Sequence, residues 1–312
     1  VRISVPASTS NIGPGFDVMG MALSLLLQVE ATFTPPADTV DATDAVLTSW
    51  TIDYDGDSPE TVLLDARKNL ITRTAADVVA RHVGAGRLPH GLHVHVNNPI
   101  PLGRGLGSSG AAVAAGVLLG SALGDLNLDL DMQLAECLRI EHHPDNVTAA
   151  LAGGWVACWT DSATHRGGFV HLPVNKDVLA VAVSPRFEVK TAAARGVLPK
   201  SYSLEDVVFN LQRLTQLTVV LGAEQLDAEK IHRAMQDRVH QPYRQSLIPG
   251  MDHLLQTMTP ASDPGLLGVC ISGSGPTVLA LVSRAADANA IAAKIQAVFA
   301  KQNIQSDARV LE

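Results

Sequence analysis

The feature that most constrains the fold is a glycine-rich turn at residues 101–110, Pro-Leu-Gly-Arg-Gly-Leu-Gly-Ser-Ser-Gly. Residues 90–98 before it alternate apolar and polar side chains, as a strand does, and residues 110–124 after it are small and apolar, as in a buried helix. Glycine lets the backbone approach a ligand closely, and the first turn of a helix presents unpaired N–H groups. The turn therefore predicts a strand, a loop and a helix that together bind an anion such as phosphate.

Other interpretations of this turn are weaker. Residues 105–110 fit GxGxxG, but a dinucleotide site needs a second strand that ends in an acidic residue about 20 positions on, and Asp125 follows a helix instead. A P-loop needs Gly-Lys-Ser/Thr, and the chain has neither this motif nor the HRD and DFG motifs of protein kinases. A packing role for the glycines stays open, because glycines recur along the helix at Gly110, Gly116, Gly120 and Gly124.

Composition narrows the class of partner. The formal net charge of -8 argues against nucleic acid and anionic membranes, which are bound through basic surfaces. The longest apolar stretch, residues 110–124, is shorter than the roughly 18 residues of a membrane span, and residues 2–5 resemble a strand rather than a leader peptide. The 3 cysteines are scattered, as in a reducing compartment. We expect a cytoplasmic protein that binds small molecules, without nucleic acid or membrane partners.

Strands and helices mix without a βαβ rhythm, so the pattern predicts an α+β fold with a domain boundary near residue 160, giving domains 1–160 and 161–312. Residues 34–44 are rich in turn formers. The expected strands are residues 2–5, 23–33, 46–54, 90–98, 178–184, 266–271 and 277–282. The expected helices are residues 68–83, 110–124, 129–141, 203–222, 227–236 and 285–300, with Asp129 or Asp131 as a helix N-cap.

Two further motifs accompany the glycine-rich turn. Residues 6–17 read Pro-Ala-Ser-Thr-Ser-Asn-Ile-Gly-Pro-Gly-Phe-Asp, and residues 272–277 read Ser-Gly-Ser-Gly-Pro-Thr. In this order the three motifs resemble the signatures of the galactokinase, homoserine kinase, mevalonate kinase and phosphomevalonate kinase (GHMP) superfamily. The form of residues 6–17, with His-Pro-Asp-Asn at 143–146 and Pro-Tyr-Arg at 242–244, is similar to the homoserine kinase family.

This resemblance implies an N-terminal domain like ribosomal protein S5 domain 2, a ferredoxin-like C-terminal domain and an active site between them. It implies direct in-line transfer of phosphate from ATP, with Mg²⁺, to L-homoserine, the step toward threonine. Members of the family are commonly homodimers. Two alternatives stay open: a kinase for another small alcohol, such as shikimate or a mevalonate derivative, and a silent paralogue that senses a metabolite.

The resemblance also implies roles for individual residues. The expected ATP-binding residues are Asn69, Pro101, Gly103, Arg104, Gly105, Leu106, Gly107, Ser108 and Ser109. Ser109 and Glu141 are expected at Mg²⁺, and His143 and Asn146 in the catalytic pocket. Asn11 and Asp17 are expected at the amino end of the substrate, Arg195 and Arg244 at its carboxylate, and Thr191 nearby. Asn69 could equally be a helix N-cap.

Asn146 is the most informative of these residues for mechanism. Mevalonate-type relatives carry Asp near this point as a candidate base, whereas an amide does not accept a proton at neutral pH. We therefore expect Asn146 to orient the substrate hydroxyl, with Asp17 as a competing base. A zinc site is disfavoured, because Glu141, His142 and His143 lack HExxH spacing. His142 departs from the Gly that is common at this position, and His93 and His95 fit an exposed strand face.

Overall fold

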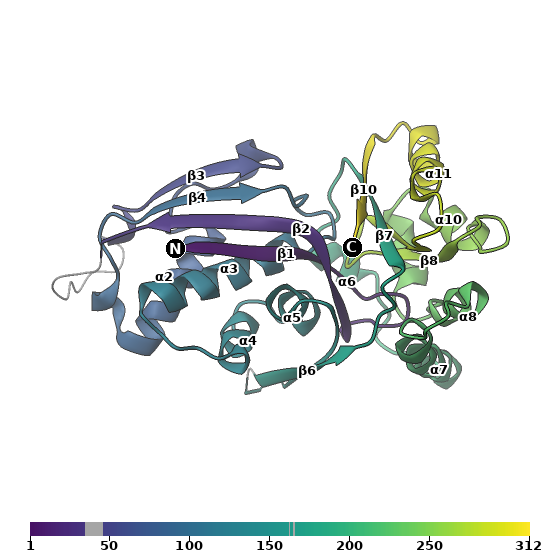
Figure 1. Cartoon of the computed structure of the whole chain (residues 1–312), viewed down its shortest axis with the longest axis horizontal. Coiled ribbons are helices and arrows are strands. Elements are labelled where there is room, and N and C mark those ends of the chain that lie inside the picture. Colours follow the sequence, from purple (N-terminus) through teal and green to yellow (C-terminus); the bar gives the residue numbers. More distant parts are fainter. Residues whose placement is uncertain (35–45, 162, 165) are drawn as a thin grey trace.

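The computed structural model describes residues 1–34, 46–161, 163–164 and 166–312, and two β-sheets organise them (Figure 1). The first sheet has the strand order β3-β4-β2-β5-β6, and β1 pairs with β2 outside that path. β3 and β4 are parallel, and the other pairs are antiparallel. The strands of this sheet are β1 (Arg2–Ser10), β2 (Met19–Thr32), β3 (Thr51–Gly56), β4 (His93–Asn98), β5 (Trp155–Asp161) and β6 (Arg166–Leu172).

Helices cover one face of the first sheet, as Figure 1 shows. They are α2 (Leu70–Val83), α3 (Ser108–Leu123), α4 (Leu130–Leu138) and α5 (Pro144–Ala152). The predicted buried helix is confirmed: α3 lies between β1 and α2, and its apolar side chains are buried on several sides. α5 packs against β2 at Gly20, where a Cβ would collide with the carbonyl oxygen of Asp145. This close contact fixes the N-terminal end of α5 beside the ends of β1 and β2.

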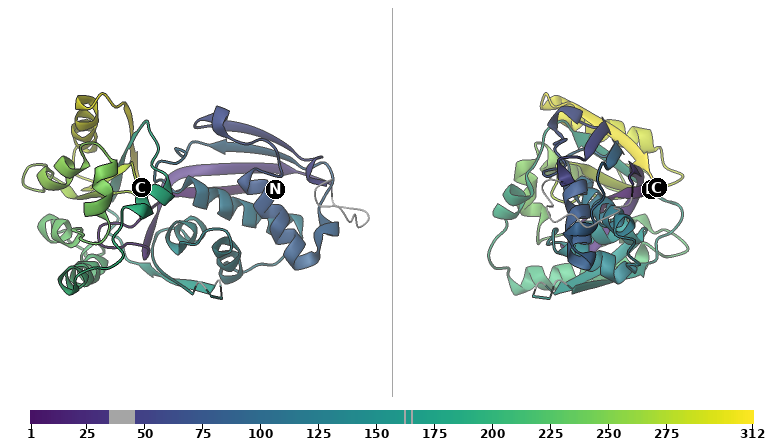
Figure 2. Two further views of the ribbon diagram at one scale, coloured as in Figure 1. Left: turned by 180° about the vertical axis from the view of Figure 1, so that it is seen from behind. Right: turned by 90° about the vertical axis from the view of Figure 1, so that its left-hand side faces the viewer.

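The second sheet has four antiparallel strands in the order β10-β7-β9-β8. They are β7 (Val178–Pro185), β8 (Leu266–Ile271), β9 (Val278–Ser283) and β10 (Ser306–Leu311). Together with the helices between them they form the βαββαβ arrangement of ferredoxin-like domains, as expected. The helices are α6 (Thr191–Gly196), α7 (Leu204–Val220), α8 (Ala228–Ala234), α9 (Gln241–Arg244), α10 (Met251–Thr257) and α11 (Ala288–Lys301). Figure 2 shows the two lobes side by side from behind.

Local sequence explains where five of the ten helices named above begin. The side chains of Asn69, Asp129, Ser203, Asp227 and Asp287 each accept a hydrogen bond from a backbone N–H of the first helical turn. Such caps satisfy donors that have no partner within the helix, and each contributes about 1 kcal/mol. The prediction that Asp129 caps a helix is confirmed. Asn69 was expected either to bind ATP or to cap a helix, and it is the N-cap of α2.

Several predicted boundaries were wrong. Residues 46 and 47 are helical and the strand begins only at Thr51, because an apolar run by itself does not distinguish a buried helix from a strand. The helix expected over residues 129–141 ends at Leu138, so Glu141 lies in the connection to α5. The strands β5, β6 and β10 and the helices α5, α6, α9 and α10 were missed, and most of the turn-rich segment 34–44 lies outside the described residues.

The change of sheet lies beyond the boundary expected near residue 160. β6 pairs with β5 in the first sheet and ends at Leu172, whereas β7 begins the second sheet at Val178.

Cys137, Cys158 and Cys270 are buried free thiols.

Across the described ranges, none of the helices combines the length and the apolar character that crossing a membrane requires.

Candidate active site

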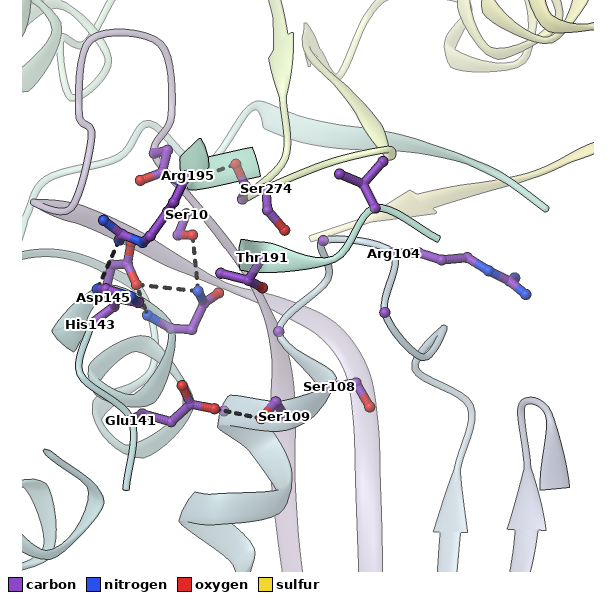
Figure 3. A pocket seen from close by; sticks show the side chains of 18 of the residues that line it. Ser10, Arg104, Ser108, Ser109, Glu141, His143, Asp145, Thr191, Arg195 and Ser274 are labelled. Carbon is purple, nitrogen blue, oxygen red and sulfur yellow. Dashed lines mark hydrogen bonds between the residues drawn. The ribbon is translucent and has the colours of Figure 1, made fainter. Parts of the chain in front are cut away.

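A cleft of about 450 Å³ lies between the two domains (Figure 3). It is bordered by the β1–β2 connection, the glycine-rich turn, the N-terminal end of α5, the segment before α6, and the turn after β8. Most of the residues that the sequence predicted for ATP, metal and substrate therefore meet in one place. Those that border the cleft are Asn11, Asp17, Gly103, Arg104, Gly105, Gly107, Ser108, Ser109, Glu141, His143, Asn146, Thr191, Arg195 and Arg244.

The glycine-rich turn ends in the N-terminus of α3. Gly107 is the N-cap at φ +69, without a capping side chain, and a Cβ there would collide with Ser8 Oγ. The first N–H groups of this 16-residue helix are therefore available to an anion beside the cleft. The turn after β8 supports the loop: Ser272 Oγ donates to the Gly105 carbonyl (2.6 Å), and the Thr277 N–H donates to the Arg104 carbonyl (3.2 Å).

A second hollow of about 310 Å³ adjoins the other side of the turn and shares Gly103, Ser108 and Ser109 with the cleft. Asn69 borders it, so this residue combines its N-cap role with a place at a cavity. The remaining lining is mainly apolar, and the hollow is therefore suited to a flat ring next to an anion site. Its apolar lining residues include Leu27, Tyr54, Val62, Leu63, Leu70, Ile71, Val96, Leu102 and Ala112.

Two oxygen-bearing side chains meet at the N-terminal end of α3. Ser109 Oγ donates to Glu141 Oε1 at 2.5 Å, and Figure 3 shows both at the lower edge of the cleft. Among the described residues, no cluster of three or more His, Cys, Asp or Glu side chains forms a metal site of protein ligands alone. A carboxylate and a hydroxyl beside an anion site fit Mg²⁺, which binds through one or two carboxylates, substrate phosphates and water.

On the opposite side of the cleft, Asp17 and Arg195 form an ion pair. Arg195 Nη2 donates to both Asp17 carboxylate oxygens, at 2.7 and 2.9 Å, and to His143 Nδ1 at 2.8 Å. Because a guanidinium only donates, His143 Nδ1 is the acceptor and the ring is neutral with its proton on Nε2. Burial also lowers the pKa of His143. The three side chains come from the β1–β2 connection, α6 and the residue before α5.

Arg244 is the second arginine of this charged group. Its side chain is only 2% exposed, and it donates to the carbonyls of Ala194 (3.2 Å) and Gly273 (3.0 Å). The guanidinium groups of Arg244 and Arg195 lie 4.9 and 5.4 Å from the ring centre of Phe16, a cation–π distance. Asn11 Nδ2 donates to the same Gly273 carbonyl at 2.9 Å. The turn after β8 thus holds the charged side of the cleft as well as the glycine-rich turn.

Asn146 lies between the two sides in a dense hydrogen-bond network. Ser8 Oγ donates to Asn146 Oδ1 (2.9 Å), and Asn146 Nδ2 donates to Ser10 Oγ (3.0 Å) and Asp145 Oδ1 (3.2 Å). Asp145 is 1% exposed, and burial followed by the nearby Asp17 carboxylate raises its pKa to about 7. Sequence reasoning missed Ser8, Ser10 and Asp145. The i, i+2 spacing of two serines on one strand face was the available signal.

Three predicted ATP-binding residues lie differently from the rest. Pro101 and Leu106 are buried and border neither the cleft nor the hollow. The Arg104 side chain points away from the other labelled residues in Figure 3, and its Nη1 lies 3.7 Å from Asp57 Oδ1. Asp57 Oδ2 also accepts from the Leu102 N–H at 3.1 Å. The contact between Arg104 and Asp57 therefore ties the glycine-rich turn to the end of β3.

Comparisons with known proteins agree with this arrangement. Residues 69–154 match the family model of the GHMP kinases N terminal domain, and residues 221–301 match that of the GHMP kinases C terminal. The chain is 42% identical to homoserine kinase of Saccharomyces cerevisiae, in an alignment that covers 100% of this chain and 96% of the relative. It is 39% identical to homoserine kinase of Candida albicans, covering 100% and 95%.

Solved structures give the same result. The crystal structure of homoserine kinase from Cytophaga hutchinsonii is similar with a TM-score of 0.78 and 29% identity, covering 99% of this chain and 93% of that one. A putative homoserine kinase from Listeria monocytogenes has a TM-score of 0.71 and 27% identity, covering 100% and 95%. A mevalonate kinase structure at 12% identity, with a TM-score of 0.68 and coverage of 100% and 99%, shares the fold.

Proposed function

The chain belongs to the homoserine kinase family of the GHMP kinases and is a kinase, and from this premise we propose its reaction. It transfers the γ-phosphoryl group of ATP to the side-chain hydroxyl of L-homoserine, giving ADP and O-phospho-L-homoserine for threonine synthesis. The transfer is direct and in line, without a phosphorylated enzyme intermediate. We propose the cytoplasm as its location and only small molecules as its ligands, with neither nucleic acid nor a membrane as a partner.

One observation carries the choice of substrate: an anion and two cations lie together across the cleft from the N-terminus of α3. Asp17 Oδ1 is 2.7 Å from Arg195 Nη2, and Arg244 lines the same end of the cleft. An α-amino acid carries its ammonium and carboxylate on one carbon, so its site needs opposite charges as close neighbours. Mevalonate, shikimate and galactose lack an ammonium group and would leave Asp17 without a ligand partner.

ATP occupies the other side of the cleft in this proposal. The adenine ring enters the apolar hollow beside Asn69, and the phosphates lie against Gly103, Gly105, Gly107 and the N-terminus of α3. Because the hollow and the cleft share Gly103, Ser108 and Ser109, one nucleotide reaches from one to the other.

We assign Ser109 and Glu141 as the protein ligands of Mg²⁺. A Mg²⁺ ion held there would neutralise charge on the phosphates of ATP. The Ser109–Glu141 hydrogen bond brings the two oxygens to the phosphate side of the cleft, where the loop N–H groups also lie. Replacing Glu141 with Gln should therefore raise the Mg²⁺ concentration needed for half-maximal activity about tenfold or more, measured by Mg²⁺ titration at fixed ATP.

Asn146 orients the acceptor hydroxyl, and no side chain is required as a base. Phosphoryl transfer through a loose transition state depends chiefly on positioning and on charge neutralisation. Asp17, the competing base, is held by two hydrogen bonds from Arg195, which favours a binding role. His143 supports Arg195 by accepting its third hydrogen bond, and Thr191 borders the cleft nearby.

The test is release of ADP from magnesium-ATP with a panel of homoserine, shikimate, mevalonate and galactose. Turnover with homoserine alone is the expected result. Turnover with mevalonate but not with homoserine would show that homoserine is not the substrate. Absence of turnover with every alcohol, together with tight binding of homoserine, would favour a metabolite sensor over an enzyme.

We also propose that the protein is a homodimer paired through α7. The helix exposes an uncharged stripe of Leu204 (79% exposed), Val208, Leu211, Thr215 and Val219 (67% exposed). The stripe is apolar at both ends, so two antiparallel copies place Leu204 of one against Val219 of the other, as a two-fold interface requires. Leu211→Glu should convert a dimer into a monomer in sedimentation analysis, whereas a monomeric wild-type protein would exclude this pairing.

A further inference from the structure

The carboxylate of Asp145 lines the cleft, but the proposed reaction leaves it without a role. It follows Pro144 in the first turn of α5 and is 1% exposed, so it does not reach into the open part of the cleft. Its Oδ1 accepts from the Asn146 backbone N–H at 2.7 Å and from Asn146 Nδ2 at 3.2 Å. Both contacts are made to the residue that is proposed to orient the substrate.

These contacts use all the donors of the Asn146 side chain. One Nδ2 hydrogen goes to Asp145 Oδ1 and the other to Ser10 Oγ at 3.0 Å. Asn146 Oδ1 accepts from Ser8 Oγ at 2.9 Å, and a carbonyl oxygen has a second lone pair. The side chain therefore offers the cleft one free function, which is a hydrogen-bond acceptor.

The orientation of this amide depends on Asp145. Serine hydroxyls accept or donate, so Ser8 and Ser10 are compatible with either orientation of the Asn146 amide. An ionised carboxylate only accepts, so the amide atom that faces Asp145 must be the donor Nδ2. With Asp145 in place, Oδ1 is turned to the other side.

We infer that Asp145 is a positioning residue that fixes the Asn146 amide with Oδ1 toward the acceptor hydroxyl of the substrate. This inference rests on the proposed function. The hydroxyl then donates a hydrogen bond to Asn146 Oδ1, and its oxygen lone pairs stay free to attack the γ-phosphorus. As the bond from the γ-phosphorus to ADP breaks, the hydroxyl proton passes to an oxygen of the transferred phosphoryl group. If the amide turned over, Nδ2 would donate to one of these lone pairs and compete with the attack.

The first experiment replaces Asp145 with Ala and is run at pH 8, above the pKa of about 7 of this carboxyl. Alanine has no side-chain acceptor, so nothing at this position selects the Nδ2 end of the Asn146 amide and its orientation is no longer fixed. Asn would not serve, because the Asn146 backbone N–H would hold its oxygen in the place of Asp145 Oδ1. We expect kcat to fall by about 100-fold, the effect of a misplaced reacting group. KM for homoserine and for ATP should stay unchanged, because Asp17, Arg195 and the glycine-rich turn are intact.

The matched control is Thr148→Val. Thr148 lies one turn further along α5, is equally buried at 1% exposure and does not border the cleft. Its kcat and KM should match those of the wild type. Thermal melting and binding of a non-hydrolysable ATP analogue to each variant separate a loss of folding from a loss of turnover.

A double-mutant cycle tests whether Asp145 acts through Asn146. Asn146→Ala should lower kcat by about 100-fold, and adding Asp145→Ala to it should cost no more than about threefold further. Additive losses in kcat would mean that Asp145 acts independently of Asn146 and would overturn the inference.

Ser8→Ala provides a second test of the inference, which does not depend on whether the Asp145 variant folds. This change removes a donor to Asn146 Oδ1 but leaves the carboxylate that sets the orientation, so kcat should fall less than about tenfold. A loss as large as that of Asn146→Ala would show that Ser8 sets the orientation instead. If the wild type phosphorylates homoserine and Asp145→Ala retains its kcat, only this inference fails; if the wild type does not, the proposed function fails.

Discussion

The two sides of the cleft are built in different ways. The phosphate side consists of residues 103–110, where small residues let backbone N–H groups face the ligand. The acceptor side consists of charged and amide side chains from segments far apart in the chain: Asn11 and Asp17, His143 and Asn146, Arg195, and Arg244. Binding by backbone N–H groups requires that no large side chain stands in the way. Binding on the acceptor side requires a particular side chain at each of its positions. The two sides should therefore respond differently to substitution and to pH.

The largest expected effect is on the phosphate side. Gly107→Ala places a Cβ against Ser8 Oγ at a residue with φ +69, so the turn must move away from the N-terminus of α3. We expect kcat/KM for ATP to fall by about 1,000-fold, comparable to loss of oxyanion donors, as measured by initial rates. Gly91→Ala is the control, because Gly91 has a similar φ of +72 with no neighbouring atoms within 4 Å. Equal losses in both variants would point to backbone strain rather than to the site.

Substitutions on the acceptor side should weaken binding of homoserine and leave binding of ATP unchanged. Asp17→Asn removes the charge that is proposed to bind the substrate ammonium, and we expect KM for homoserine to rise about 100-fold, or about 2.7 kcal/mol. KM for ATP should not change. A pH-dependent loss of kcat with KM for homoserine intact would instead identify Asp17 as the base, in conflict with its proposed binding role.

The buried carboxyl on the acceptor side makes stability depend on pH. Because burial and the Asp17 charge raise the pKa of Asp145 to about 7, the folded protein binds a proton that the unfolded chain releases above pH 3.8. This stabilisation is complete in acid and is lost as pH rises toward 7, so the free energy of unfolding should fall by about 2 kcal/mol between pH 5 and pH 7. Urea unfolding of the wild type and Asp145→Asn measures the difference, and parallel pH curves for the two proteins would contradict it.

The smallest effect is expected at Arg104. Its side chain contacts Asp57 rather than the other cleft residues, so its removal takes away no contact with the nucleotide in the proposed arrangement. Arg104→Ala should therefore raise KM for ATP less than about fivefold in the same initial-rate assay. A rise as large as that of Gly107→Ala would mean that the guanidinium binds phosphate, as the sequence motif implied.

The difference between the two sides also explains what the sequence predicted. The phosphate side is contiguous, so the glycine spacing and the apolar helix after it predicted a strand, a loop and a helix directly. The acceptor side became recognisable only through the family motifs, since no local pattern links Asp17 to Arg195. Their mutual ion pair was not foreseen, because the sequence suggested opposite ends of the substrate for them.

Other features depended on tertiary contacts and were missed. Asp145 stands next to Asn146 in the chain, but its burial follows from the packing of α5 on Gly20 of β2. Likewise, Ser8 and Ser10 belong to a strand whose end faces a helix that the sequence pattern did not predict. A short helix such as α5, with nine residues beginning at a proline, has too few turns to give a clear apolar period.

The turn after β8 has a consequence for engineering. Residues 272–277 belong to the C-terminal domain, yet they hydrogen-bond to Arg104 and Gly105 of the nucleotide side and to Asn11 of the acceptor side. The domains are therefore not exchangeable parts of which one binds the nucleotide and the other the acceptor. A chimera that takes its C-terminal domain from another kinase of this fold would replace the support under both ligands, and a change of acceptor specificity is better attempted by substitutions within the β1–β2 connection and α6.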